Sequence, residues 1–150
     1  MRRLRLNLPR KLTRRERPNP LLKPRKSLVG QQVHLLQKDK ELKIWGDGSQ
    51  IRSFCYIDDL MKGLDLLIEH NVQQPINIGS SEAITMTELA DMLLEISGKK
   101  LKKVYQPTEP TGCWKRSSDN TLIKKLIGWE PNTPLKEGLE KTFEYVKNKI

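Results

Sequence analysis

The chain has 150 residues, about the length of one domain, and a formal net charge of +10. Residues 1–26 hold 11 basic residues and one acid, whereas residues 27–150 are neutral overall. No stretch approaches the roughly 18–20 apolar residues of a membrane span. Two isolated histidines and two cysteines (Cys55 and Cys113) form neither a metal-ligand cluster nor a disulfide framework. We expect a cytoplasmic chain with reduced thiols and no metal.

Residues 1–30 form a basic segment in which disorder is expected, because prolines interrupt it and its like charges repel one another. Three interpretations stay open for residues 1–26: a solvated tail, an arm that binds nucleic acid or another anionic surface, and an organelle transit peptide. The lack of aromatic side chains disfavours base stacking, and the lack of serine before Ser27 disfavours the transit peptide. Residues 31–150 are expected to form the folded domain.

The first half of that domain predicts a helix within residues 28–40 and then two strands within residues 41–56, folded as a hairpin about the glycines of residues 46–49. A helix follows from Asp58 or Asp59, whose carboxylates are expected to cap it. Residues 74–79 read as a short buried strand closed by glycine. The apolar stripe expected on the helix consists of Leu60, Met61, Leu64, Leu67 and Ile68.

The second half opens with the best-marked helix, which starts at the capping box of Thr85 and Glu88 and ends at Gly98. A strand is predicted over residues 101–105, as in a crossover unit with residues 75–79. A helix over residues 119–127 should turn Leu122, Ile123 and Leu126 inward and end at Gly128. A last helix is predicted with Thr133 as N-cap, Pro134 at N1 and an apolar stripe of Leu135, Leu139, Phe143, Val146 and Ile150.

Three polar residues are candidates for binding an anion. Gln50 and Arg52 are two residues apart, hence on one face of a strand, where a guanidinium can clamp phosphate in bidentate fashion. Arg116 precedes a helix N-terminus in a loop rich in proline and glycine. The alternatives are a solvated strand arginine for Arg52 and ordinary helix capping by Ser118 or Asp119 for the loop.

Two further pairs suggest chemistry less directly. Tyr145 and Lys149 have Tyr-x-x-x-Lys spacing, which places phenol and ammonium side by side on a helix, but no nucleotide-binding element precedes them. Asp58 and Asp59 form a carboxylate pair that is better explained by helix capping than by acid–base work. We therefore assign no catalytic residue.

Together these segments form a known pattern. Residues 44–59 read IWGDGSQIRSFCYIDD and resemble the W-G-D-G-x-Q-x-R-x-F-x-x-[IV]-D-D segment of the extended short-chain dehydrogenase/reductase enzymes, the NAD-dependent nucleotide-sugar epimerases and dehydratases. Residues 77–79 (NIG), 116–120 (RSSDN), 128–131 (GWEP) and 135–139 (LKEGL) resemble later motifs of that family in the same order. The similarity covers residues 41–150 and is greatest to the GDP-mannose 3,5-epimerases.

The resemblance implies an α/β fold that corresponds to the C-terminal, substrate-binding portion of such a Rossmann-type enzyme. It implies that Gln50, Arg52 and Arg116 contact the diphosphate of a nucleotide sugar, with a GDP-hexose expected. The family's cofactor is NAD, held by an N-terminal half whose glycine-rich loop and catalytic Tyr-x-x-x-Lys have no match in these 150 residues. We expect the chain alone to bind no NAD and to be inactive, unless a partner chain or a homodimer supplies that half.

Departures from the family pattern leave other interpretations open. Trp114 and Lys115 stand where the family often has arginine and glycine, and only Lys26 lies near the place of its acid–base lysine. A truncated or frame-shifted product would explain the foreign composition of residues 1–26. The alternatives are a degenerate, non-catalytic nucleotide-sugar-binding domain and a nucleic-acid-binding module that uses residues 1–26.

Overall fold

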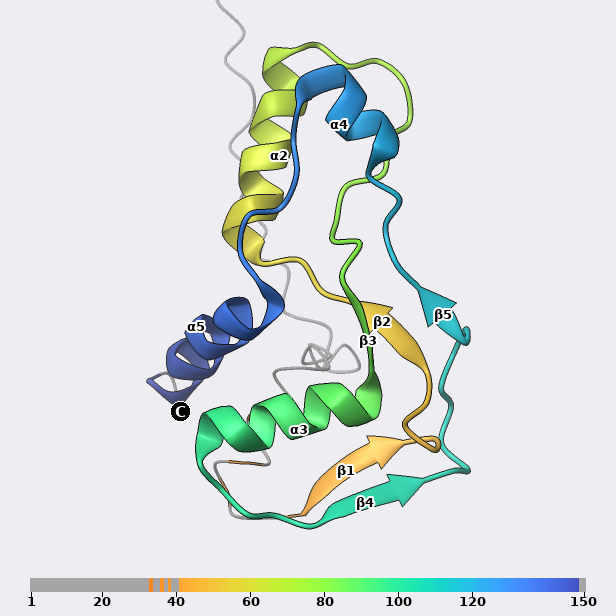
Figure 1. Ribbon diagram of the computed structural model, residues 1–150, viewed down its shortest axis with the longest axis vertical. Coiled ribbons are helices and arrows are strands. Elements are labelled where there is room, and N and C mark those ends of the chain that lie inside the picture. The colour runs from red at the N-terminus through yellow and green to blue at the C-terminus, as the bar shows by residue number, and fades with distance from the viewer. Residues whose placement is uncertain (1–32, 34–35, 37, 39–40, 149–150) are drawn as a thin grey trace, which may run out of the picture.

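The computed structural model describes Val33, Leu36, Lys38 and residues 41–148 (Figure 1). The expectations for residues 1–30, for most of the helix within residues 28–40, and for Lys149 and Ile150 lie outside these residues. Val33 and Leu36 are helical and fully buried. The other elements are β1 (Leu42–Trp45), β2 (Ile51–Ser53), α2 (Ile57–Glu69), β3 (Ala83–Thr85), α3 (Met86–Ser97), β4 (Lys103–Gln106), β5 (Lys115–Arg116), α4 (Thr121–Ile127) and α5 (Leu135–Lys147).

The described strands form two small sheets. β1 pairs with β4 in parallel, and β2 lies between β3, its antiparallel neighbour, and β5, its parallel neighbour. The hairpin expected within residues 41–56 is therefore wrong. Its glycines do adopt positive φ angles, 75° at Gly46 and 80° at Gly48. However, the Gly46 N–H donates to Gln106 O and the Gly48 carbonyl accepts from Thr87 N–H, so the turn is bonded to β4 and α3 and carries the chain between sheets.

Helix α3 is the centre of the hydrophobic core. Its sequence signals are confirmed, because Thr85 and Glu88 form the reciprocal capping box and Gly98 ends the helix with φ 67°. The strand predicted next is also confirmed, as β4. The buried side of α3 packs with β1, α5 and the two described residues before β1; the core residues are Val33, Leu36, Leu42, Ile44, Met86, Leu89, Ala90, Leu93, Leu135, Leu139 and Phe143.

Helix α2 begins near Asp58 and Asp59 as expected, but neither carboxylate caps it. Asp59 is buried and accepts a hydrogen bond from the backbone N–H of Thr133, 2.8 Å away. Burial acts to raise the pKa of Asp59, but hydrogen bonds from Thr133 and from the Asn132 N–H outweigh it and hold the pKa below its usual value. Asp59 thus fastens α2 to the segment that leads into α5.

Other expectations for α2, α4 and their surroundings are corrected. Residues 74–79 form no strand; the Gly79 carbonyl accepts from the Asn120 side chain instead of a ladder partner, so the crossover with residues 101–105 does not exist. Along α4, Ile123 is fully buried, but Leu122 and Leu126 are exposed. Most of the α2 stripe is exposed as well. Helix α5 starts one residue later than predicted, with Pro134 as N-cap.

Candidate functional site

The two candidate arginines lie on neighbouring strands. Arg52 of β2 is the register partner of Arg116 of β5, 64 residues further along the chain. Side chains alternate between the two faces of a strand, so register partners on adjacent strands lie on the same face. Like charges placed opposite each other repel. No salt bridge within the described residues involves either arginine, so an anion that contacts both guanidinium groups would relieve this repulsion.

The side chain of Arg52 is fixed by backbone carbonyl oxygens. Its guanidinium donates to Ile51 O and Thr111 O, both at 2.7 Å, and to Trp114 O at 3.4 Å. These contacts position the group without neutralising its charge. The loop that carries Thr111 is in turn held against β2, because the Ile51 N–H donates to the Trp114 carbonyl at 2.9 Å.

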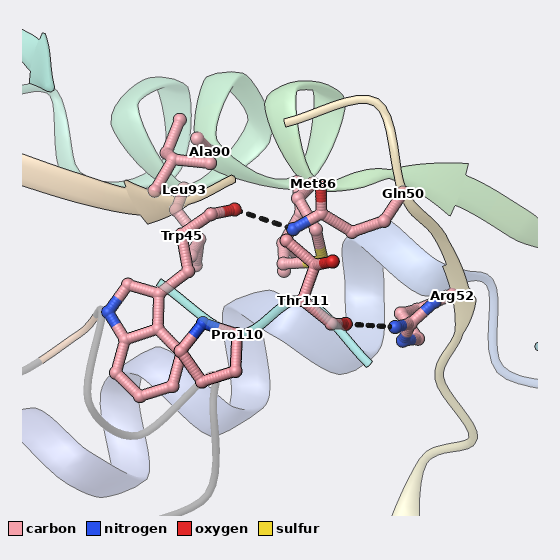
Figure 2. A pocket seen from close by; sticks show the side chains of 10 residues that line it. Trp45, Gln50, Arg52, Met86, Ala90, Leu93, Pro110 and Thr111 are labelled. Carbon is pink, nitrogen blue, oxygen red and sulfur yellow. Dashed lines mark hydrogen bonds between the residues drawn. The ribbon is translucent and has the colours of Figure 1, made fainter. Parts of the chain in front are cut away.

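Gln50 lies in the turn directly before β2 and shares a cavity with Arg52. The cavity has a volume of about 90 Å³. Figure 2 shows its lining residues, which are Ile44, Trp45, Gln50, Arg52, Pro110 and Thr111 together with Met86, Leu89, Ala90 and Leu93 of α3. Gln50 is only 6% exposed and donates from Nε2 to Trp45 O at 2.6 Å. Its Oε1 is buried without a hydrogen-bond partner. Such an atom is costly unless a ligand donor or a water reaches it.

The sequence prediction overlooked Trp45. This side chain is half exposed and lies beside Pro110 at the end of the cavity away from Arg52 (Figure 2). The signal was present in the alternation of β1, where Leu42 and Ile44 are buried and Lys43 and Trp45 are exposed. A large aromatic residue on the outer face of a short strand needs a reason other than packing in the core.

The remaining candidates are separate from this cavity. Asp119 accepts from the N–H and hydroxyl of Thr121, but the N-cap of α4 is Asn120, whose side chain makes no capping hydrogen bond. Arg116 itself is an exposed strand residue. Tyr145 is exposed, and its possible partner Lys149 lies outside the described residues.

Burial, with the charge of Asp59 adding to it, raises the pKa of the Cys55 thiol. Neither a possible metal-ion cluster nor a membrane-length apolar helix occurs among residues 41–148 and the three described before them.

Comparisons with known proteins show which family this chain resembles. The model of the NAD dependent epimerase/dehydratase family matches residues 18–79. The chain is 44% identical over 108 residues to GDP-mannose 3,5-epimerase of Arabidopsis thaliana, a match covering 72% of this chain and 28% of the relative. The chain resembles the NAD-dependent epimerase/dehydratase family over these residues. The family resemblance and α/β fold class predicted from the sequence are thereby confirmed.

Solved structures of nucleotide-sugar epimerases show the same fold. A variant of UDP-glucuronic acid 4-epimerase from Bacillus cereus, in complex with UDP-4-deoxy-4-fluoro-glucuronic acid and NAD, superposes with a TM-score of 0.77 at 30% identity, over 85% of this chain and 42% of that one. UDP-glucose 4-epimerase from Thermotoga maritima, solved with UDP-glucose, gives 0.72 at 30% identity, over 81% and 39%. The chain therefore spans well under half the length of these epimerases.

Proposed function

We propose that this chain binds the diphosphate of a nucleotide sugar, a GDP-hexose, as the substrate-binding part of a GDP-mannose 3,5-epimerase-like enzyme. The observation that carries the proposal is the in-register pairing of Arg52, which lines the cavity of Gln50 and Trp45, with Arg116 on the neighbouring strand. The names of the relatives support the substrate class, since they include a GDP-mannose epimerase and epimerases bound to UDP sugars.

The chemistry of the two arginines suits a diphosphate. A guanidinium presents a planar fork of donors that matches phosphate oxygens, and its charge is permanent. The three carbonyl contacts of Arg52 fix its side chain before a ligand arrives, which reduces the entropy lost on binding. Arg116 is exposed, so we expect it to become ordered only against the bound anion.

The rest of the nucleotide is expected to lie on the open surface. A cavity of about 90 Å³ admits a small group and not a whole nucleotide. We propose that the indole of Trp45 packs against the base and that a ligand hydroxyl or amine donates to Gln50 Oε1. Both side chains line the cavity shown in Figure 2.

The described residues do not form a site that fits NAD. A dinucleotide pyrophosphate needs a glycine-rich turn that leads from a strand into a helix N-terminus. The glycine turn of this chain, at Gly46 and Gly48, leads instead into β2. We therefore derive no redox step from these residues, and we propose that the chain alone neither binds NAD nor epimerises a sugar.

Calorimetric titration tests the proposal. The 150-residue chain should bind GDP-mannose, and Arg52→Ala and Arg116→Ala should each weaken binding by about 10–150-fold, the range for a lost charged hydrogen bond. Lys115→Ala is the matched control, because Lys115 neighbours Arg116 on β5 but points to the other face. Unchanged affinity in both arginine variants would remove them from the site. Parallel titrations with UDP-glucose and NAD test the choice of nucleotide and the expected lack of NAD binding.

A further inference from the structure

The strand that carries Arg116 is too short to fix this residue by itself. β5 has two residues and lies at an edge of its sheet among the described strands, so Arg116 ends a ladder of two register pairs. The ends of short ladders fray, because little backbone bonding opposes local opening. Arg116 must nevertheless stay opposite Arg52 if one anion is to contact both guanidinium groups. The residues after Arg116 therefore decide whether this pair is maintained.

Those residues are bonded to the segment that precedes β3. The Ser118 N–H donates to Ser80 O at 3.2 Å, and the Asn120 side chain donates from Nδ2 to Gly79 O at 2.8 Å. The Ser118 hydroxyl donates to Asn120 Oδ1 at 2.6 Å and so orients that amide. We call Gly79, Ser80, Ser118 and Asn120 the backbone clamp. It holds the chain just beyond Arg116 at two successive carbonyl groups.

The backbone clamp requires a close approach of two chain segments. A Cβ built on Gly79 would lie 3.0 Å from Ser118 Cβ and 3.3 Å from the Ser118 hydroxyl oxygen. Both distances are shorter than ordinary van der Waals contact, so a side chain at residue 79 would push the segments apart. The glycine that the sequence suggested as the end of a strand thus permits the contact between residues 79 and 118.

The other side of the backbone clamp is attached to the core. Ser80 is 7% exposed, and its hydroxyl accepts the Glu82 N–H at 3.1 Å. The chain then enters β3, which pairs with β2 on the side opposite to β5 and continues directly into α3. The segments before β3 and after β5 both run from this sheet toward α4 (Figure 1). The backbone clamp therefore joins the two outer strands of the sheet beyond the end of β2.

We propose that Asn120 and Ser118 are positioning residues that hold Arg116 opposite Arg52 for a bound diphosphate. This inference rests on the proposed function, which gives the two arginines their ligand. Asn120 and Ser118 act on the backbone from which the Arg116 side chain extends, and neither has to touch the ligand. With the clamp formed, only the exposed side chain of Arg116 becomes ordered on binding. Without it, the ligand must also order the end of β5, which lowers its affinity.

Asn120→Ala in the 150-residue chain tests the inference by NMR. The Ser118 N–H should exchange with solvent at least about tenfold faster, while the Met86 N–H, bonded to Gln50 O at 3.1 Å, should be unchanged. GDP-mannose affinity, titrated on the same sample, should fall about tenfold, the loss expected when one more backbone residue must be ordered. Asn148→Ala makes the same change at the exposed end of α5 and should alter neither measurement.

Double substitutions separate positioning from a general loss of structure. In the Arg116→Ala background, Asn120→Ala should weaken binding by less than about twofold further, because Asn120 acts only through Arg116. In the Arg52→Ala background it should have its full effect. A fold that is merely loosened would lose affinity equally in both backgrounds. Gly79→Ala, which forces the backbone clamp apart with Asn120 intact, should reproduce the effect of Asn120→Ala.

Other results would overturn the inference. Faster exchange at Ser118 with unchanged affinity would leave the proposed function intact and make the backbone clamp a structural feature only. Unchanged exchange in Asn120→Ala, or equal losses in the two arginine backgrounds, would contradict an action through Arg116. Unfolding of both Asn120→Ala and Gly79→Ala would assign the clamp to the stability of the whole fold. Failure of the wild-type chain to bind GDP-mannose would reject the proposed function, and this inference with it, whatever the exchange rates show.

Discussion

Arg52 differs from several lysines of the described chain in the partners it has. Lys103, Lys124 and Lys136 each contact a carboxylate within 2.8 Å. Arg52 contacts only carbonyl oxygens, which orient a guanidinium without cancelling its charge. Most surface ion pairs contribute little stability, so the main effect of these three lysine–carboxylate pairs is to neutralise charge at the surface. We expect the uncompensated charge of Arg52, beside that of Arg116, to attract an anion to this sheet.

A second effect at the residue scale concerns Asp59. The folded-state pKa of Asp59 is lowered, so its stabilising contribution is fully present above the unfolded value near 3.9 and is lost as pH falls through the folded pKa. We expect Asp59→Asn to cost about 1.5–3 kcal/mol at neutral pH, the range for a hydrogen bond to a charged group. The difference from wild type should shrink below pH 4.

Urea unfolding at several pH values measures this effect. Asp58→Asn is the control, because Asp58 is adjacent and exposed. Equal stability of wild type and Asp59→Asn at pH 7 would show that the contact with Thr133 contributes nothing.

The two thiols should differ in reactivity. Cys113 is exposed, whereas Cys55 is half-buried and its pKa is raised by burial and by the charge of Asp59. The thiolate is the reactive form, so a maleimide at pH 7 should modify Cys113 in a fast phase and Cys55 in a slow one. Single Cys→Ser variants assign the phases, and a fast reaction at Cys55 would contradict the burial seen here.

At the scale of the element, the capping box at the start of α3 should contribute to the stability of that helix. Thr85→Ala should lower the free energy of unfolding by about 1 kcal/mol, because the Thr85 hydroxyl oxygen accepts the Glu88 N–H at 3.1 Å. Thr108→Ala, the same change in an exposed loop, is the control and should be neutral within about 0.5 kcal/mol. Chemical denaturation compares the two variants, and equal stability would mean that the box is not maintained in solution.

The contrast between α3 and the strands shows what the sequence could predict. A capping box and a left-handed glycine are local features, so both ends of α3 were predictable. The partners of β1 and β2 are chosen by residues far along the chain, and the glycine turn is compatible with either a hairpin or a change of sheet. Motifs suggested Arg52 and Arg116 separately, but only the pairing of β2 with β5 places them together. The proposed role of Trp45 in packing against a base rests on the exposure of its side chain, which the alternation of buried and exposed residues in β1 indicated.

Gly63 provides a test of how α2 is held. In an exposed helix, alanine is better than glycine by about 1 kcal/mol. Here a Cβ would lie 2.6 Å from Ile78 Cδ1 and 2.7 Å from Trp129 Cε2, and the indole ring has little freedom to move. Gly63→Ala should therefore destabilise the chain by about 1–3 kcal/mol despite the gain in helix propensity. Thermal unfolding decides the sign, with the exposed Lys62→Ala as control; a stabilised Gly63→Ala would mean that Trp129 and Ile78 do not pack on this helix.

At the scale of the whole molecule, the elements fall into two groups. The core around α3, β1 and β4 lies toward one end, and α2 and α4 lie toward the other (Figure 1). The strand β2 connects them and carries Arg52, while the bond from Asp59 to Thr133 ties α2 to the start of α5. The arginine site and the exposed apolar side chains of α2 and α4 are thus on different elements. Substitutions in one should leave the other intact.

The net charge of the molecule is unevenly distributed along its sequence, which permits a last prediction. Residues 1–26 hold the whole net charge of +10, and residues 27–150 are neutral. If residues 1–26 are a nucleic-acid arm, the less favoured of the interpretations left open for them, the full chain should bind duplex DNA of any sequence with an affinity that falls steeply with salt, because binding releases counterions. Deletion of residues 1–26 should abolish this binding and leave GDP-mannose affinity unchanged, since Arg52 and Arg116 remain. Fluorescence anisotropy at 50 and 200 mM salt measures the first effect, and calorimetry the second. DNA binding that survived the deletion would place a nucleic-acid surface on the folded domain and contradict this division.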